Sequence, residues 1–364
     1  MKNKTLLTKI VWLTLLLILG MVVGCSRLDY VIEQGAGQMM LQNRSKRNKD
    51  VLKDRRVPQD FKNKISKIEV YKKYFYQYFG EEEKGIYSRT TMLKSSAATY
   101  LVIASPPNEI KAVNTCFPFM GCFPYLGFFD PESALRYETE MKEKNFVTYK
   151  RPVYAYSTLG FFEDTILSSF FIFDDFDLAE LIFHELFHTI FFAKNEVDLN
   201  EALANYFGME LAKEYFKLDP IKAQDIVQKS KKRDVLFSRL VKHADELNLL
   251  YQKEVDLSAP KAKFILDTYL DKTFFPDIRK VCAEQALTDS DCFPLRQTWN
   301  NATFAAYMTY EKDINFIEKV RLQKNLDLKG LLSLVKIDFD RYLKESHPDQ
   351  ESFAHFIIRI ENIK

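Results

Sequence analysis

The sequence predicts an α+β fold: a small N-terminal sheet, then two helices that carry a candidate metal site, then a helical C-terminal part. Two observations indicate this order. The two segments typical of strands, residues 99–104 and 147–156, lie in the first half of the chain. Helical patterning prevails in the second half, including a long charged segment over residues 221–253.

Composition limits the classes of protein. The 364 residues suffice for one large or two ordinary domains, and 47% hydrophobic content with 31 Phe and 19 Tyr supplies an ample core. Only 11 glycines are present, with no glycine-rich phosphate-binding motif, which argues against a nucleotide-binding fold. The first 24 residues contain three lysines and no acidic residue. When they are left out, 49 of the 52 basic residues remain, against 50 acidic ones. This near-neutral balance gives no reason to expect nucleic-acid binding.

Residues 1–24 are predicted to be a lipoprotein signal peptide. Three lysines precede an uncharged run over residues 10–23 that is too short for an ordinary membrane span. The run ends Val-Val-Gly-Cys, which resembles a bacterial lipobox with Cys25 as the acylated residue. An uncleaved anchor is the alternative. We expect attachment to a lipid bilayer of the bacterial cell envelope, facing the periplasm or the surface. The outer membrane is favoured because Ser26 is not an aspartate retention signal.

Three further parts are expected. Residues 25–57 form a membrane-proximal helical segment, whose basic run over residues 44–49 is either a solvated face or a contact with anionic headgroups. Residues 58–218 form the domain with the metal site, and residues 219–364 form a helical C-terminal subdomain. The helices expected in these two parts cover residues 62–79, 131–144, 199–215, 221–253, 261–270, 304–312 and 328–363, besides the helix of the metal site.

Four cysteines remain beside Cys25. An even number in an oxidising compartment indicates disulfides. Proximity pairs Cys116 with Cys122 and Cys282 with Cys292. Two other connectivities are possible, and buried free thiols are the alternative.

The most informative motif is His184-Glu185-Leu186-Phe187-His188. On a helix, residues four apart lie on one face, so both imidazoles can bind one metal ion. Glu201, in the following helix, supplies a third ligand, and two histidines with one glutamate form a hydrolytic zinc centre of the thermolysin type. Glu185 can then act as general base on a zinc-bound water. The alternative is a surface helix with two solvated histidines, which the apolar flanking residues disfavour.

Longer stretches resemble the bacterial family of predicted lipoprotein aminopeptidases, a gluzincin-like group. The resemblance implies a zincin-like metallopeptidase fold. It lies in the lipobox, in the Cys-Phe-Pro and Gly-Cys segments at residues 116–129, in residues 154–168, in residues 182–188 and 200–202, and in Asn300-Asn301-Ala302.

The resemblance also implies roles for residues around the metal. Asn205 stands where thermolysin has an aspartate that orients a ligand histidine, so this contact is expected to be neutral and weaker. Tyr307 and Tyr310 resemble the family's tyrosine pair, and either is a candidate donor to the oxyanion. The alternative is that both tyrosines belong to the core.

Substrate placement is predicted less directly. Residues 156–161 are a candidate edge strand that pairs with an extended peptide, the alternative being an ordinary buried strand and turn. Glu163 and Asp164 are candidates for holding a free amine. The residues chosen for substrate contact are Tyr156, Thr158, Leu159 and Gly160.

Together these observations predict a membrane-anchored zinc metallopeptidase, with an aminopeptidase as one possibility and peptides as its substrates. Two alternatives are open. One is a zinc-binding envelope lipoprotein that does not cleave and acts as scaffold or chaperone. The other is an anchored structural protein without metal. The sequence predicts no protein partner.

Overall fold

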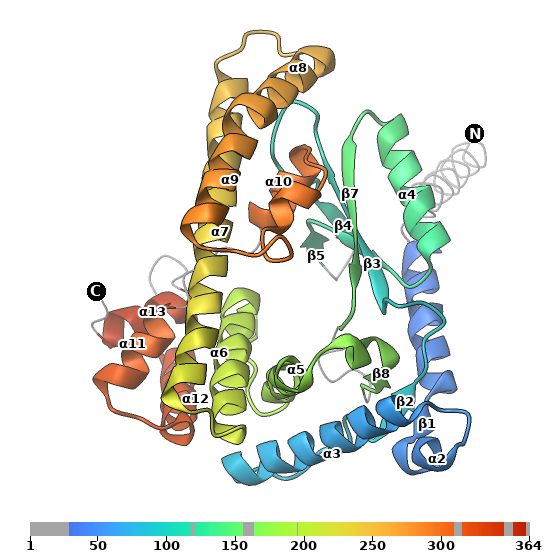
Figure 1. The fold of residues 1–364 in the computed structure, drawn as a ribbon, viewed down its shortest axis with the longest axis vertical. Coiled ribbons are helices and arrows are strands. Elements are labelled where there is room, and N and C mark those ends of the chain that lie inside the picture. Colours follow the sequence, from blue (N-terminus) through green and yellow to red (C-terminus); the bar gives the residue numbers. More distant parts are fainter. Residues whose placement is uncertain are drawn as a thin grey trace, which may run out of the picture.

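The computed structural model describes residues 29–117, 121–155, 164–194, 196–308, 315–345 and 352–361, and it is mixed α and β, mostly helical with small sheets (Figure 1). The α-helices are α2 (Asn48–Lys53), α3 (Gln59–Phe79), α4 (Pro131–Glu143), α5 (Asp175–Phe187), α6 (Val197–Tyr215), α7 (Pro220–Gln252), α8 (Ala259–Tyr269), α9 (Phe275–Glu284), α10 (Asn301–Met308), α11 (Asn315–Gln323), α12 (Leu328–Lys344) and α13 (Phe353–Ile360). Three short helical segments of other types are η1 (Ser168–Ile172), η2 (Leu270–Phe274) and η3 (Phe293–Arg296).

Within the described residues the strands form three small sheets. One has the order β1-β2-β8, the second has the antiparallel order β6-β3-β7, and β4 pairs with β5 in a hairpin. In the second sheet β7 lies at the edge and pairs with β3 alone among these strands. The strands are β1 (Lys46–Arg47), β2 (Arg89–Thr91), β3 (Thr99–Ser105), β4 (Thr115–Phe117), β5 (Gly121–Phe123), β6 (Leu126–Phe128), β7 (Val147–Val153) and β8 (Ile166–Leu167).

The largest core surrounds α5. Its side chains Leu178, Ile182 and Leu186 recur at helical spacing and are fully buried, as an apolar helix face requires. Helices α3 and α6 pack against α5, and α12, which packs on α6 and α13, extends the same core. Phe191, after α5, contacts Phe339 of α12 edge to face. The last part of the chain therefore belongs to the core that supports the histidine motif.

A second core lies at the other end of the molecule. It joins the C-terminal half of α7 with α8, α9, η3 and α10. Phe274, Trp299 and Phe304 contact one another at its centre. His243, one of the three histidines outside the motif, is buried here and contacts Tyr269 and Asp277 at hydrogen-bond distance. Helix α10 also packs on β3 and β7, which joins this core to the sheet.

Helix α7 connects the two ends of the molecule. Its 33 residues span roughly 50 Å at the helical rise of 1.5 Å per residue. Its first half stands beside α6 and its second half enters the second core (Figure 1). The residues expected to form one C-terminal subdomain, 219–364, thus divide between two cores.

The N-terminal segment, expected to be helical over residues 25–57, is helical in two parts within the described residues. Residues 29–44 are helical, but the helix stops at Ser45 and the chain forms β1, which pairs with β2 before α2 begins. The interruption has a physical cause, since Arg89 donates hydrogen bonds to both the hydroxyl and the carbonyl of Ser45. Tyr30 donates to the carbonyl of Gly127, so the helix docks on β6. None of the helices in the described ranges is long and apolar enough to cross a membrane.

Both expected cysteine pairs are confirmed. The structure joins Cys116 to Cys122 across the β4–β5 hairpin, and Cys282 in α9 to Cys292 just before η3. The second pair closes a loop of polar residues, 285–291, over the interior of the molecule.

Candidate metal centre

Helix α5 presents both histidines from its C-terminal end. Asp174 caps its start by accepting the backbone N–H of Asp177, which begins the helix two and a half turns before His184. His188 is the capping residue at the other end. The two imidazole rings lie edge to face with centroids 5.0 Å apart, the arrangement expected of residues four apart on one face.

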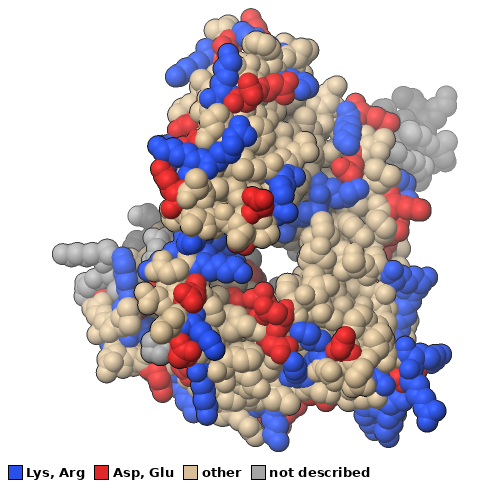
Figure 2. Space-filling model, in the orientation of Figure 1, with Lys and Arg blue, Asp and Glu red and all other residues tan. Residues whose placement is uncertain are grey.

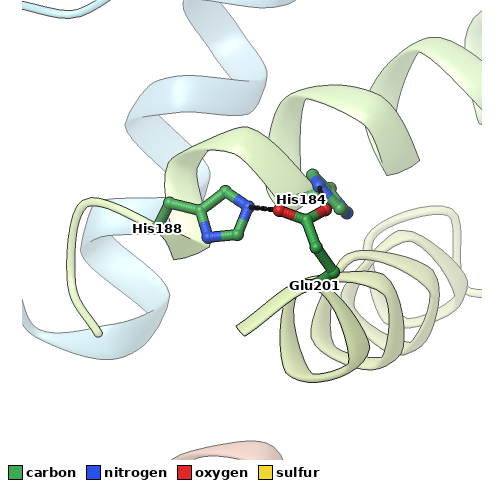
Figure 3. Close-up of side chains that lie close together, drawn as sticks. All are labelled: His184, His188 and Glu201. Carbon is green, nitrogen blue, oxygen red and sulfur yellow. Dashed lines mark ion pairs between the residues drawn. The ribbon is translucent and has the colours of Figure 1, made fainter. Parts of the chain in front are cut away.

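Helix α6 brings Glu201 to the histidines. His184 Nε2 lies 3.4 Å from one carboxylate oxygen of Glu201 and His188 Nε2 lies 3.5 Å from the other (Figure 3). The connection between the helices is held by Asn200, whose buried amide accepts from the N–H of Ala193 and donates to its carbonyl. This clamp sets where α6 starts, and so where the next residue, Glu201, points.

The donor set fits a zinc ion. Ligand atoms about 2.1 Å from a tetrahedral ion lie roughly 3.4 Å from one another. The two nitrogen–oxygen distances match this spacing, and one ligand atom from each of the three residues lies within 4.8 Å of the others. Two imidazole nitrogens and a carboxylate are also the ligand types that zinc prefers.

The electrostatics favour the metal-binding protonation states of two of the three residues. Burial, with the neighbouring His184, lowers the pKa of His188 to about 4, so this imidazole is neutral at pH 7. Burial would raise the pKa of Glu201, but both histidines hold it below its ordinary value, so it is ionised. For His184, burial lowers the pKa, while the contact with Glu201 and the charge of Glu185 outweigh it and raise the pKa. A metal ion must therefore displace a proton from His184 in acidic solution.

Three further side chains interact with this cluster or lie beside it. Glu185 is 7% exposed and lines the groove beside the histidines. Tyr87 is 2% exposed, and burial together with the charges of Glu185 and Asp164 raises its pKa. Asn205, on α6, hydrogen-bonds to His184. This amide–histidine contact is the neutral one that the sequence predicts.

A groove of about 1340 Å³ passes over the cluster. Helices α5 and α6 form one side, α7 another, the ends of β3, β6 and β7 a third, and the loop before η3 a fourth. Figure 2 shows a central opening in this region, with acidic and basic side chains on its rim. The charged residues that line the groove are Arg151, Asp174, Asp177, Glu180, His184, Glu185, His188, Glu201, Lys229, Arg233 and Asp291.

The charges in the groove are arranged by helix. Asp174, Asp177 and Glu180 follow one another every three residues along α5, while Lys229 and Arg233 lie one turn apart on α7. Burial raises the pKa of Glu180, and the charge of Arg233 lowers it by less than burial raises it. The carboxylate of Glu180 makes no hydrogen bond or ion pair with any residue that the structure describes.

Several residues predicted for the site lie elsewhere in the fold or outside the residues that the structure describes. Tyr307 does not line the groove: its hydroxyl donates to Gln297, and its ring stacks on Phe293 in the second core. Asp164 is buried and likewise does not line it. The remaining predictions, for Cys25, Tyr156, Thr158, Leu159, Gly160, Glu163 and Tyr310, lie outside the described residues.

Sequence reasoning missed four residues of the site. Asn200 and Gly208 position the helices, Glu180 lines the groove, and Tyr87 interacts electrostatically with Glu185. The sequence itself contained a signal for two of these residues. Glu180 stands four residues before His184 and therefore shares its helix face, and Gly208 is an isolated glycine within a helical pattern. Tyr87 had no such signal, because its contact depends on distant packing.

The site has a defined arrangement, in which two imidazoles and a carboxylate converge in a groove with a further carboxylate beside them. The model of the family described as "Putative aminopeptidase" matches residues 29–357, and the chain belongs to this family. Neither the curated proteins nor the solved structures contain a match to the chain. Membership in the family indicates a peptidase.

Proposed function

We propose that this protein is a zinc-dependent peptidase of zincin-like fold, in which His184, His188 and Glu201 hold the ion. The observation that carries the proposal is the convergence of both Nε2 atoms on the two oxygens of Glu201 at the spacing of zinc ligands. When bound, zinc supplies a Lewis acid that lowers the pKa of a coordinated water to about 7. The family description supports a peptide as substrate.

Glu185 moves the proton. It follows a ligand histidine directly and faces the groove, so it can accept a proton from the attacking water. The water oxygen bonds to the peptide carbonyl carbon, the carbon–nitrogen bond breaks, and Glu185 returns the proton to the leaving amine.

The substrate backbone is held by strand addition. β7 is an edge strand, and Arg151, Val153 and Ala155 at its end line the groove. An extended peptide that pairs there would satisfy the free backbone groups of the edge and lie across the cluster. Residues 156–161, the predicted substrate strand, lie outside the described residues.

Glu180 is the group that holds the α-amine of an aminopeptidase substrate. It shares a face of α5 with His184, one turn away, and its carboxylate has no cationic partner among the described residues. An ammonium group bound there would relieve the cost of burying the carboxylate. This role replaces the expectation for Asp164, which lies outside the groove lining.

Zinc content and peptide turnover test the proposal together. Purified protein is expected to carry about one zinc, to lose activity to a chelator and to regain it on zinc addition. His184→Ala, His188→Ala and Glu201→Ala are each expected to lose zinc first and activity as a result. His355→Ala, on the distant helix α13, is the matched control and should keep both. Protein that binds zinc but cleaves nothing in a broad peptide library would contradict the peptidase and favour the scaffold.

The amine contact has its own test. Glu180→Gln should raise KM for peptides with a free amine at least ten-fold and leave N-acetylated peptides unaffected. Asp177→Asn, one turn further from His184, should change KM less than two-fold. Equal cleavage of free and acetylated peptides by the unmodified protein would show an endopeptidase and remove this role from Glu180.

Attachment to the envelope through an acylated Cys25 also belongs to this proposal, supported by the lipobox in the sequence. Two acyl chains would hold a protein at a bilayer stably, whereas one would not. Mass spectrometry of the membrane fraction is the measurement. An unmodified Cys25, or an intact segment 1–24, would contradict the attachment.

A further inference from the structure

The loop between α9 and η3 covers the groove from the side opposite the cluster. Leu287, Ser290, Asp291 and Phe293 line the same cavity as His184 and the two glutamates of the cluster. The other sides are formed by α5 and α6, by α7, and by the sheet ends. The cavity is therefore bordered around its circumference, and Figure 2 shows it as an opening within the molecule.

This loop is held at both ends. Cys282, in the second core, is joined to Cys292 by a disulfide, and both residues are buried. Phe293 follows immediately and packs between Phe237 and Tyr307. Because Cys282 belongs to α9, the disulfide and the aromatic contacts of Phe293 fix both ends of the loop to the second core.

The middle of the loop is also braced. Thr288 hydrogen-bonds to Ser290 and to Asp291, and its carbonyl accepts the N–H groups of Asp291 and Cys292. Arg296 donates to the carbonyl of Ser290. A loop with this many internal contacts moves little when a partner binds, unlike an open and mobile lid.

We propose that the disulfide-tied loop 283–291 restricts the groove to extended, unfolded peptide segments and excludes folded proteins. The inference rests on the proposed peptidase function. An extended chain needs about 5 Å beside a neighbouring strand, whereas a helix is about 10–12 Å across and packed sheets lie about 10 Å apart. A folded substrate would have to displace the loop, and a single extended strand would not.

The experiment compares one cleavage sequence in two contexts. A ten-residue peptide cleaved by the protein is presented free, and again as a loop in a small folded carrier without cysteines. The assay contains no reductant. We expect kcat/KM to be at least 100-fold higher for the free peptide. A destabilised variant of the carrier should be cleaved faster in proportion to its unfolded fraction.

Removing the disulfide tests the loop itself. The double variant Cys282→Ser/Cys292→Ser should gain at least ten-fold on the folded carrier, with the rate on the free peptide unchanged. Cys116→Ser/Cys122→Ser removes the other disulfide, whose cysteines do not line the groove, and should leave the ratio as it is. The unchanged rate on the free peptide also shows that a variant has folded.

The outcomes separate the two proposals. Similar rates on the folded carrier and the free peptide by the unmodified protein would overturn the restriction and leave the peptidase intact. Loss of the 282–292 disulfide without any gain on the carrier would show that the loop is not what excludes folded proteins. No cleavage of any free peptide would overturn the proposed function, and this inference with it.

Discussion

Gly208 of α6 lies directly against the backbone of His184 in α5. A β-carbon at Gly208 would come within 3.0 Å of the His184 nitrogen and 3.2 Å of its α-carbon, and within 2.9 Å of the Glu180 carbonyl oxygen. These are backbone atoms, which cannot rotate away. The missing side chain therefore allows the two helices to approach closely enough for Glu201 to reach both histidines.

Gly208→Ala is expected to separate α5 from α6 and weaken zinc binding at least ten-fold. Overpacking costs about 1–3 kcal/mol, which offsets the gain of about 1 kcal/mol in helix propensity. Gly35→Ala is the matched control, since Gly35 is also helical but has open space around it, and it should stabilise the protein. Zinc titration and thermal unfolding measure both effects. Unchanged zinc affinity in Gly208→Ala would show that the close approach does not matter.

Glu185→Gln should keep zinc and lose turnover by roughly 10²-fold or more, because the amide cannot accept a proton. The substitution preserves size, so the buried site keeps its packing. Glu143→Gln, on the exposed surface of α4, controls for the loss of one negative charge. Zinc content and kcat are measured on the same preparations. Full turnover in Glu185→Gln would rule out this residue as the base.

Tyr307→Phe is expected to leave kcat within about three-fold, contrary to the role that the family resemblance implies. The hydroxyl already donates to Gln297 in the second core, 3.0 Å away. Loss of this hydrogen bond should cost about 1 kcal/mol of unfolding free energy. Denaturant unfolding and steady-state kinetics decide the matter. A 100-fold fall in kcat with normal stability would restore the oxyanion role, and Tyr310→Phe tests the second tyrosine of the pair.

Asp338 makes stability depend on pH. Burial, aided by the charge of Glu361, raises the pKa of this α12 carboxyl to about 6 from an ordinary 3.8. The folded state therefore keeps a proton that the unfolded chain loses between about pH 4 and 6, so stability falls as pH rises through this range. Asp338→Asn should remove the cost and stabilise the protein by about 1–3 kcal/mol at pH 7.5, and less at pH 4.5.

The measurement for Asp338 is urea unfolding at both pH values. Asp340→Asn, an exposed neighbour on the same helix, is the control and should show no such dependence. If Asp338→Asn stabilises equally at pH 4.5 and 7.5, the effect comes from packing and not from the charge.

The sequence predicted those features that depend on local pattern. Helices α3, α5, α6 and α7 agree with the expected ranges to within about three residues, and β3 and β7 lie where alternation placed them. The i, i+4 spacing of His184 and His188 indicated a shared face without any knowledge of tertiary contacts. The two disulfides followed from short separations along the chain.

Features that depend on distant packing were not predictable. β1 is two residues long and exists because it pairs with β2, some forty residues away. The hydroxyl of Tyr307 is committed to Gln297, which the spacing of two tyrosines cannot show. The groove itself is assembled from eight separate stretches of the described chain, so its charged lining has no signature in any single segment.

The position of α12 and α13 in the core that α5 and α6 share has a consequence for the order of folding. Both helices are translated after every residue of the candidate cluster, and Phe353 donates its N–H to Glu196, just before α6. While the chain is still being made, the apolar faces of α5 and α6 lack these partners and the cluster has no finished support. The core that supports the candidate cluster is therefore complete only when almost the whole polypeptide has been synthesised.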